Sequence, residues 1–209
     1  MASRPGSTGR RERAKEDKRR RIMDAARALF AEHGVGGVTT QRIADRADVA
    51  IGTLYLYAST KAELLILVQN EKFATAIDEG LHAAGAAARA GGDVVGSVLA
   101  LVEPAVACLR ERPENGRAYL QELVFGDPAG PHCRDGLALA LRLERGIAGT
   151  LARDAGIAPG EAAVLARVIT AVIHVTTTAT LHLQDGLAEV LDDIRRQVSA
   201  VLRSLSGTR

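Results

Sequence analysis

Residues 39–64 read TTQRIADRADVAIGTLYLYASTKAEL, and they are the part of the sequence that indicates the fold most clearly. Thr39 or Thr40 can cap a short helix, and Asp48 follows that helix in a tight turn. We expect a second short helix from Ala50 to Tyr57. Two short helices joined by a tight turn are typical of the helix-turn-helix arrangement.

Helices are also predicted on both sides of this stretch. Apolar residues recur at three- and four-residue spacing from about Lys15 until Gly34, a typical helix stop. Thr60 followed by Glu63 forms a capping box that opens a long helix. Beyond residue 80, glycine and proline breaks near 91–92, 113, 126–131 and 159–160 separate further helices. The sequence therefore predicts an all-α protein of about nine helices.

The second helix of the motif is too short to be stable alone, and it carries two tyrosines that we expect to be exposed. A helix of this kind fits the major groove of duplex DNA, where its side chains meet base edges. Hydroxyls, amides, an ammonium group and apolar tips all suit contacts with bases or phosphates. The residues expected to contact DNA are Thr40, Gln41, Ile51, Gly52, Thr53, Tyr55, Leu56, Tyr57 and Lys61.

The charge distribution agrees with a polyanionic partner. Residues 1–21 hold nine Arg and Lys against three Asp and Glu, a balance of +6 that leaves −4 for the rest of a chain of net charge +2. Because the N-terminal arm is cationic and the rest of the chain is acidic, a polyanion attracts the arm first. A solvated tail is the alternative interpretation, and residues 1–14 are expected to be a flexible basic leader.

The region 17–66 resembles the DNA-binding domain of the tetracycline-repressor (TetR) family. The residues that carry the resemblance are Gly34, Thr39, Thr40, Ile43, Ala44, Ala47, Val49, Gly52, Thr53, Leu54, Tyr55, Tyr57, Lys61, Glu63 and Leu64. The resemblance implies that Thr40, Tyr57 and Lys61 hold phosphates, while Gln41, Ile51, Thr53 and Tyr55 lie near base edges. It also implies a dimeric transcriptional regulator, more often a repressor, released from palindromic operator DNA by a small-molecule inducer.

Three residues depart from the usual family pattern. Asp48 stands where the family usually has Gly, at a turn position expected to be left-handed. Ala50 replaces a usual Ser or Thr, which removes a helix cap worth about 1 kcal/mol. Ala58 replaces a common Phe and thins the packing under the motif.

The predicted organisation is a leader at 1–14, a DNA-binding domain at 15–66 and a ligand-binding and dimerisation domain at 67–209. Two helices at about 161–183 and 187–205 carry apolar stripes, and the resemblance favours them as the homodimer interface over a purely internal core. The candidate pocket residues are polar or aromatic on apolar backgrounds: Cys108, Tyr119, Glu122, Phe125 and His174. For each of them an ordinary core or surface position remains the competing interpretation.

Other classes of protein find little support. We find no Gly-rich phosphate loop, nucleophile elbow or paired catalytic carboxylates, so we expect no enzyme and no cofactor. Cys108 and Cys133 give no zinc spacing, and no metal site is expected. No uninterrupted apolar run reaches the roughly 18–20 residues of a membrane span, so we expect a cytoplasmic protein without membrane contact. An architectural protein that binds DNA without sequence choice remains the alternative, ahead of an all-α enzyme.

Overall fold

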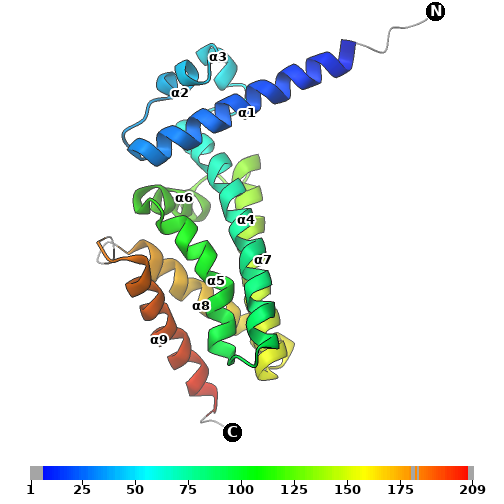
Figure 1. Ribbon diagram of the computed structural model, residues 1–209, viewed down its shortest axis with the longest axis vertical. Coiled ribbons are helices and arrows are strands. Elements are labelled where there is room, and N and C mark those ends of the chain that lie inside the picture. Colours follow the sequence, from blue (N-terminus) through cyan, green and yellow to red (C-terminus); the bar gives the residue numbers. More distant parts are fainter. Residues whose placement is uncertain (1–6, 180–181, 183, 207–209) are drawn as a thin grey trace, which may run out of the picture. The chain divides into compact units, whose positions relative to one another are not determined.

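The computed structural model describes residues 7–179, 182 and 184–206, and these residues form nine helices and no strand. The all-α prediction is confirmed (Figure 1). The helices are α1 (Ser7–His33), α2 (Thr40–Arg46), α3 (Ile51–Leu54), α4 (Lys61–Arg89), α5 (Val94–Arg110), α6 (Pro113–Phe125), α7 (Pro131–Ala155), α8 (Pro159–Thr178) and α9 (Leu187–Ser206). The chain divides into two compact units, Met1–Val68 and Gln69–Arg209, whereas the sequence placed the boundary after residue 66.

The first unit is built on the packing of α1 against α2 and of α2 against α3. Gly34 ends α1 with a backbone φ of 67°, a left-handed conformation that glycine adopts without strain. Ile43 of α2 and Leu54 of α3 are both 0% exposed, which confirms that they belong to the core beneath the motif. Burial of such side chains, at about 1.5–3 kcal/mol each, holds together two helices that are too short to persist alone.

The first helix begins earlier than its periodicity indicates. We expected a flexible leader at 1–14 and a helix from about Lys15, but α1 is helical from Ser7. Residues 10–21 contain many Arg, Lys and Glu, which are good helix formers even where no apolar stripe marks a helix. Apolar periodicity detects only helices with a buried face, and for this reason it missed the first two turns. Residues 1–6 of the predicted leader lie outside the described residues.

In the second unit α8 packs against four other helices, and so does α5, which packs against α6, α7, α8 and α9. The α5 side chains Val98, Leu101, Val102 and Val106 are completely buried. The α4 segment of this unit approaches α5 closely at Gly80, where a Cβ atom would collide with the carbonyl oxygen of Leu101. The expected breaks at 91–92, 113, 126–131 and 159–160 all fall at the ends of the observed helices.

The end of α8 corrects the predicted helix at 161–183. α8 ends at Thr178, and Ala179 has an extended backbone with φ −59° and ψ 139°. The buried guanidinium of Arg110 donates to the carbonyl oxygens of Thr177 at 3.2 Å, His182 at 2.9 Å and Asp185 at 2.6 Å. A helix end leaves carbonyl groups without partners, and Arg110 supplies donors to one of them and to the turn that follows. Residues 180, 181 and 183 of the predicted helix lie outside the described residues.

Among the described helices only α8 is long and apolar enough to cross a membrane, with a mean hydropathy of 1.3 and 39% of its most apolar window buried. This helix packs against α7 on one side and α9 on another. The buried part includes Leu165, Ile169 and Ile173, while Val164, Val168 and Val175 are exposed. α8 therefore has an inner apolar face in the core of the unit and an outer apolar face on its surface.

Candidate nucleic-acid interface

The first helix of the motif starts with a side-chain cap. Thr39 has an extended backbone, and its hydroxyl accepts a hydrogen bond from the backbone N–H of Arg42 at 3.2 Å. This bond satisfies one of the donors that a helix start leaves without a partner. Of the two caps that the sequence allowed, Thr39 is the one used, and Thr40 becomes the first residue of α2.

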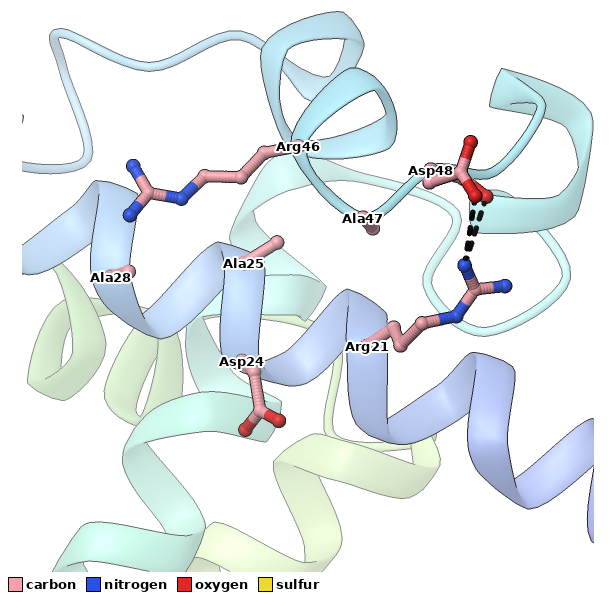
Figure 2. A pocket seen from close by; sticks show the side chains of 7 residues that line it. All are labelled: Arg21, Asp24, Ala25, Ala28, Arg46, Ala47 and Asp48. Atoms are coloured by element: carbon pink, nitrogen blue, oxygen red, sulfur yellow. Dashed lines mark hydrogen bonds and ion pairs between the residues drawn. The ribbon is translucent and has the colours of Figure 1, made fainter.

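The turn between α2 and α3 depends on a strained aspartate. Asp48 has φ 51° and is the only non-glycine residue with a positive φ among the described residues. Arg21 of α1 holds this turn, since its Nη1 lies 3.2 Å from both the carbonyl oxygen and the carboxylate of Asp48 (Figure 2). The expected left-handed conformation of Asp48 is therefore present, and α1 supports it.

A shallow hollow lies beside this turn, between α1 and the end of α2 (Figure 2). Its lining residues are Arg21, Asp24, Ala25, Ala28, Arg46, Ala47 and Asp48. The charged groups on its rim are paired, because Arg46 donates to the Glu32 carboxylate at 3.1 Å and Arg27 donates to Asp24 at 2.9 Å. The arginines beside the hollow are paired with carboxylates, and three of its lining residues are alanines. The hollow therefore results from small residues where α1 and α2 pack closely.

The second helix of the motif is shorter than predicted. α3 covers only Ile51–Leu54, whereas the sequence indicated a helix from Ala50 to Tyr57. Leu56 and Tyr57 continue as turns whose N–H groups bond to the carbonyl oxygens of Thr53 at 3.2 Å and Leu54 at 2.9 Å. The tighter spacing of these bonds winds the chain more narrowly than an α-helix. Ala50 contributes no side-chain cap, as expected from its methyl group.

The motif presents an exposed face that carries both polar and apolar groups. Leu56 is 82% exposed and Tyr55 is 47% exposed. Gly52 is exposed, and a Cβ atom there would meet nothing within 4 Å. Because packing within the protein does not require glycine at this position, its small size leaves room for another molecule. Ile51 and Thr53 are partly exposed on the same short helix.

Polar side chains lie near the start of α2, and each of them has a partner within the unit. The Thr40 Oγ1 lies 3.2 Å from the hydroxyl of Tyr55, the residue that directly follows α3. The neighbouring Gln41 donates its amide to the Asp45 carboxylate at 2.7 Å. The structure therefore brings Thr40 and Tyr55 into one hydroxyl pair, and it gives Gln41 an intrahelical partner.

Two predicted phosphate-binding residues make hydrogen bonds inside the unit. The Tyr57 hydroxyl donates to the carbonyl oxygen of Lys15 at 2.9 Å, and the Lys61 ammonium donates to that of Val38 at 3.0 Å. An ammonium group has three N–H bonds, so Lys61 keeps donors for another ligand. A phenolic hydroxyl has a single hydrogen, and Tyr57 uses it on α1.

The start of α4 follows the predicted capping box with one difference. The Thr60 hydroxyl accepts from the Glu63 N–H at 3.0 Å, which confirms Thr60 as the cap. The Glu63 carboxylate accepts from the N–H of Ser59 at 2.6 Å, one residue before the cap that the motif normally uses. Both bonds fix the chain entry into α4 and hence the position of Lys61 in its first turn.

The candidate pocket residues occupy different environments in the second unit. Tyr119 is fully buried, and its hydroxyl donates to the Asn70 side chain at 2.8 Å. Burial raises the pKa of Tyr119 above its usual range, and it raises the pKa of the Cys108 thiol to about 11. His174 is half-buried, and burial lowers its pKa. Phe125 is 81% exposed at the end of α6, so its ring lines no enclosed cavity in this structure.

Glu122, the remaining candidate, has a half-buried side chain, and its carbonyl oxygen accepts a weak bond from the Cys133 thiol at 3.8 Å. Asn70 also donates to the carbonyl oxygen of His132 at 2.9 Å. A buried polar network therefore joins α4, α6 and the start of α7 around Tyr119. Sequence reasoning missed Asn70, since an isolated polar residue in an apolar helix gives no sign of a partner 49 positions away.

Sequence reasoning also missed the role of α1 in the interface. Lys15 and Arg21 contact Tyr57 and Asp48, which are 42 and 27 positions away in the chain. The one available signal was the unusual density of cations before the first apolar stripe.

Both the sequence and the fold of this chain are similar to those of known proteins. Residues 22–68 match the profile of the bacterial regulatory proteins of the tetR family. Over 60 residues the chain is 42% identical to the HTH-type transcriptional repressor KstR of Mycobacterium tuberculosis. That alignment covers 29% of this chain and 27% of the repressor, so the likeness in sequence extends over less than a third of either protein.

The fold extends the likeness beyond that domain. A TetR transcriptional regulator from Rhodococcus sp. RHA1 superimposes with a TM-score of 0.65 at 23% identity, over 90% of this chain and 97% of that protein. The regulator FadR from Bacillus subtilis, solved in complex with stearoyl-CoA, gives a TM-score of 0.58 at 19% identity over 85% of this chain and 96% of that protein. Residues 22–68 therefore match the tetR family of bacterial regulatory proteins, and beyond them the likeness is one of fold alone.

Proposed function

We propose that the chain is a homodimeric transcriptional repressor that binds an inverted-repeat operator through α2 and α3 and is controlled by a small molecule bound in the second unit. The observation that carries this proposal is the exposed face of α3 and its following turn, with Leu56 82% exposed beside Tyr55. A single exposed leucine needs no explanation, but exposed apolar and hydroxyl side chains gathered on one short helix and its following turn are typical of a contact surface. The major groove of duplex DNA accepts a helix of this size.

The exposed face suits base edges in two ways. Thr53 and Tyr55 carry hydroxyl groups that can donate to or accept from bases, and Ile51 and Leu56 can contact thymine methyl groups. None of the four forms the bidentate pairs that arginine makes with guanine. We therefore propose that apolar contact and the deformability of the duplex contribute much of the sequence preference.

Phosphate contacts would hold the motif in the groove. The hydroxyl pair of Thr40 and Tyr55 lies at the start of α2, where backbone N–H groups also favour an anion. Lys61 retains ammonium donors for a second phosphate beside the start of α4. We propose that Tyr57 acts mainly by positioning α1, because its hydroxyl hydrogen is donated to Lys15.

The outer face of α8 is the proposed dimer interface, together with α9. Val164, Val168 and Val175 are exposed, and with Ala171 they follow the four-, three- and four-residue spacing of a helix-packing seam. Two copies of α8 and α9 would form a four-helix bundle around these side chains. A dimer of this kind places two α3 segments on one duplex, as an inverted repeat requires.

A ligand site in the second unit would make the repressor responsive. The described part of this unit has an apolar interior with a polar network at Tyr119 and Asn70, a composition that suits a largely apolar molecule with one polar group. FadR of Bacillus subtilis, which shares the fold, was solved with stearoyl-CoA. We propose a ligand of the same general character, in contact with Tyr119 and Cys108 and reached by movement of α6.

The proposal is tested by binding of the purified chain to genomic fragments, including the DNA upstream of its own gene, in excess competitor DNA and across a salt series. We expect selective retention of a few fragments, with affinity falling steeply as salt rises. Leu56→Ala should weaken that selective binding about tenfold, because the lost side chain is worth about 1.5 kcal/mol when buried.

The control is Leu141→Ala, which removes a leucine of α7 that is 48% exposed and lies outside the motif. It should leave selective binding unchanged. Equal retention of every fragment would instead indicate an architectural DNA-binding protein, and an absence of binding at low salt would leave an all-α enzyme as the remaining candidate. Either outcome contradicts the proposed function.

A further inference from the structure

The N-terminal part of α1, residues 7–21, carries more positive charge than its own carboxylates neutralise. We call residues 7–21 the cationic segment. It has three acidic residues, of which Glu16 and Asp17 are paired with Arg19, Arg20 and Arg21, and Glu12 is the third. Five other cations are exposed and form no ion pair within the part of the chain that the structure describes: Arg10, Arg11, Arg13, Lys15 and Lys18.

Two hydrogen-bonded tethers fix the cationic segment to the motif that would enter the groove. The Tyr57 hydroxyl donates to the carbonyl oxygen of Lys15 at 2.9 Å, just after α3. Arg21 donates to the carbonyl oxygen of Asp48 at 3.2 Å, just before α3. The segment is therefore held at both ends of α3, and any duplex that receives α3 lies close to it.

The segment also reaches beyond these tethers. From Lys15 to Ser7 the helix continues for about 12 Å at 1.5 Å per residue. Figure 1 shows this part of α1 extending past α3 toward the N-terminus. Along B-DNA, 12 Å corresponds to about three to four base pairs at 3.4 Å each.

The arrangement of the cations favours a phosphate backbone over other partners. Arg11, Lys15 and Lys18 follow at four- and three-residue spacing, so they share one face of α1. Like charges at this spacing repel each other and weaken an isolated helix, and a polyanion removes that repulsion. A membrane surface also attracts cations, but Ala14 is the only hydrophobic residue in the segment, and insertion requires a much larger apolar face.

We infer that the cationic segment is a second DNA-binding element, which lies along the phosphates that flank the base pairs read by α3. It contributes affinity that does not depend on sequence, and it leaves base selection to α3. This inference rests on the proposed function for the orientation of the duplex.

The test compares two triple variants with equal loss of charge. Arg11→Gln, Lys15→Gln and Lys18→Gln neutralise one face of the cationic segment. Arg117→Gln, Arg134→Gln and Arg145→Gln neutralise three exposed arginines of α6 and α7 and serve as the control. Both sets lie on exposed helix positions where glutamine is a good helix former, so both variants should fold.

The measurement is the salt dependence of binding to a duplex that the unaltered chain prefers, together with a footprint on that duplex. The slope of log affinity against log salt should fall by about 2 to 3 in the segment variant, since each lost phosphate contact contributes about 0.9. Affinity at about 150 mM salt should fall roughly ten- to a hundredfold, and protection should shrink by about three base pairs at the flanks. The preferred sequence should not change, and the control should match the unaltered chain.

Equal slopes for the two variants would overturn the inference. Loss of binding to anionic vesicles by the segment variant, with an unchanged slope on DNA, would overturn it too and assign the segment to a membrane. If the unaltered chain prefers no duplex, the proposed function fails, and the slope comparison on a random duplex still tests the segment separately.

Discussion

At the scale of a single residue, the strained backbone of Asp48 forms the turn between α2 and α3. A non-glycine residue in the left-handed region costs about 1 kcal/mol, and aspartate tolerates this region better than most residues. The Asp48 side chain is 98% exposed, so it gains no burial at this position. Its partner Arg21 bonds to the backbone carbonyl as well as to the carboxylate, and the first of these bonds does not depend on the aspartate side chain.

Substitution of Asp48 therefore separates backbone strain from side-chain contact. Asp48→Gly should leave the free energy of unfolding within about 0.5 kcal/mol of the unaltered chain, because an exposed ion pair contributes little. Asp48→Val should lower it by about 1–2 kcal/mol, since a β-branched side chain is strained at φ 51°. The measurement is urea unfolding followed by circular dichroism at one fixed protein concentration. Equal stability of the two variants would show that this turn carries no backbone strain.

At the same scale, the sequence identified the exposed groups of the interface better than their partners. The solvent exposure of Tyr55 and Leu56 followed from their positions on a short helix over a small core. The bond from Tyr57 to Lys15 joins residues 42 positions apart, and local pattern does not encode such a pairing. For this reason Tyr57 was assigned to phosphate by resemblance, while the structure gives its hydroxyl a partner in α1.

At the scale of helices, periodicity predicted where apolar stripes lie but not where helices end. In the sequence, Leu165, Val168, Val172, Val175 and Ala179 follow one another at helical spacing and form one apparent stripe. Leu165 is buried, whereas Val168 and Val175 are exposed, so this one apparent stripe spans two faces. A helix that is apolar on both faces gives no hydrophobic contrast from which its orientation can be read.

The outer face of α8 yields a prediction about assembly. Val168→Glu should convert the dimer into a folded monomer, because an exposed glutamate is tolerated in one subunit but is buried without a partner between two. The dimer dissociation constant should rise at least a hundredfold, since an unpaired buried charge costs about 3 kcal/mol or more. Sedimentation velocity measures this change. Val124→Glu, at a valine of α6 that is 55% exposed against 43% for Val168, is the control and should remain dimeric.

If Val168→Glu and the control sediment alike as dimers, the outer face of α8 is not the interface. A monomeric unaltered chain would contradict dimerisation altogether. In either case the contacts of α3 with DNA would need another explanation for sequence preference, because one motif of this size touches only a few base pairs.

At the scale of the whole molecule, positive charge is concentrated at the N-terminal end of the chain, whereas exposed apolar side chains lie on α8 in the second unit. Residues 1–21 carry a balance of +6, while the remaining chain is acidic. We propose that the cations attract any duplex at long range and that α3 then discriminates among the sequences that it meets. In the proposed function, dimerisation through the second unit brings a second copy of α3 to the duplex, and the interior of that unit binds the ligand.

Selection of binding sites from a random duplex library by the unaltered chain shows whether two copies of α3 bind one duplex together. If they do, the selection should enrich an inverted repeat whose half-site centres lie about 10 base pairs, or a multiple of that distance, apart. Enrichment of a single unrepeated site, or of no sequence at all, would contradict binding by two copies of α3.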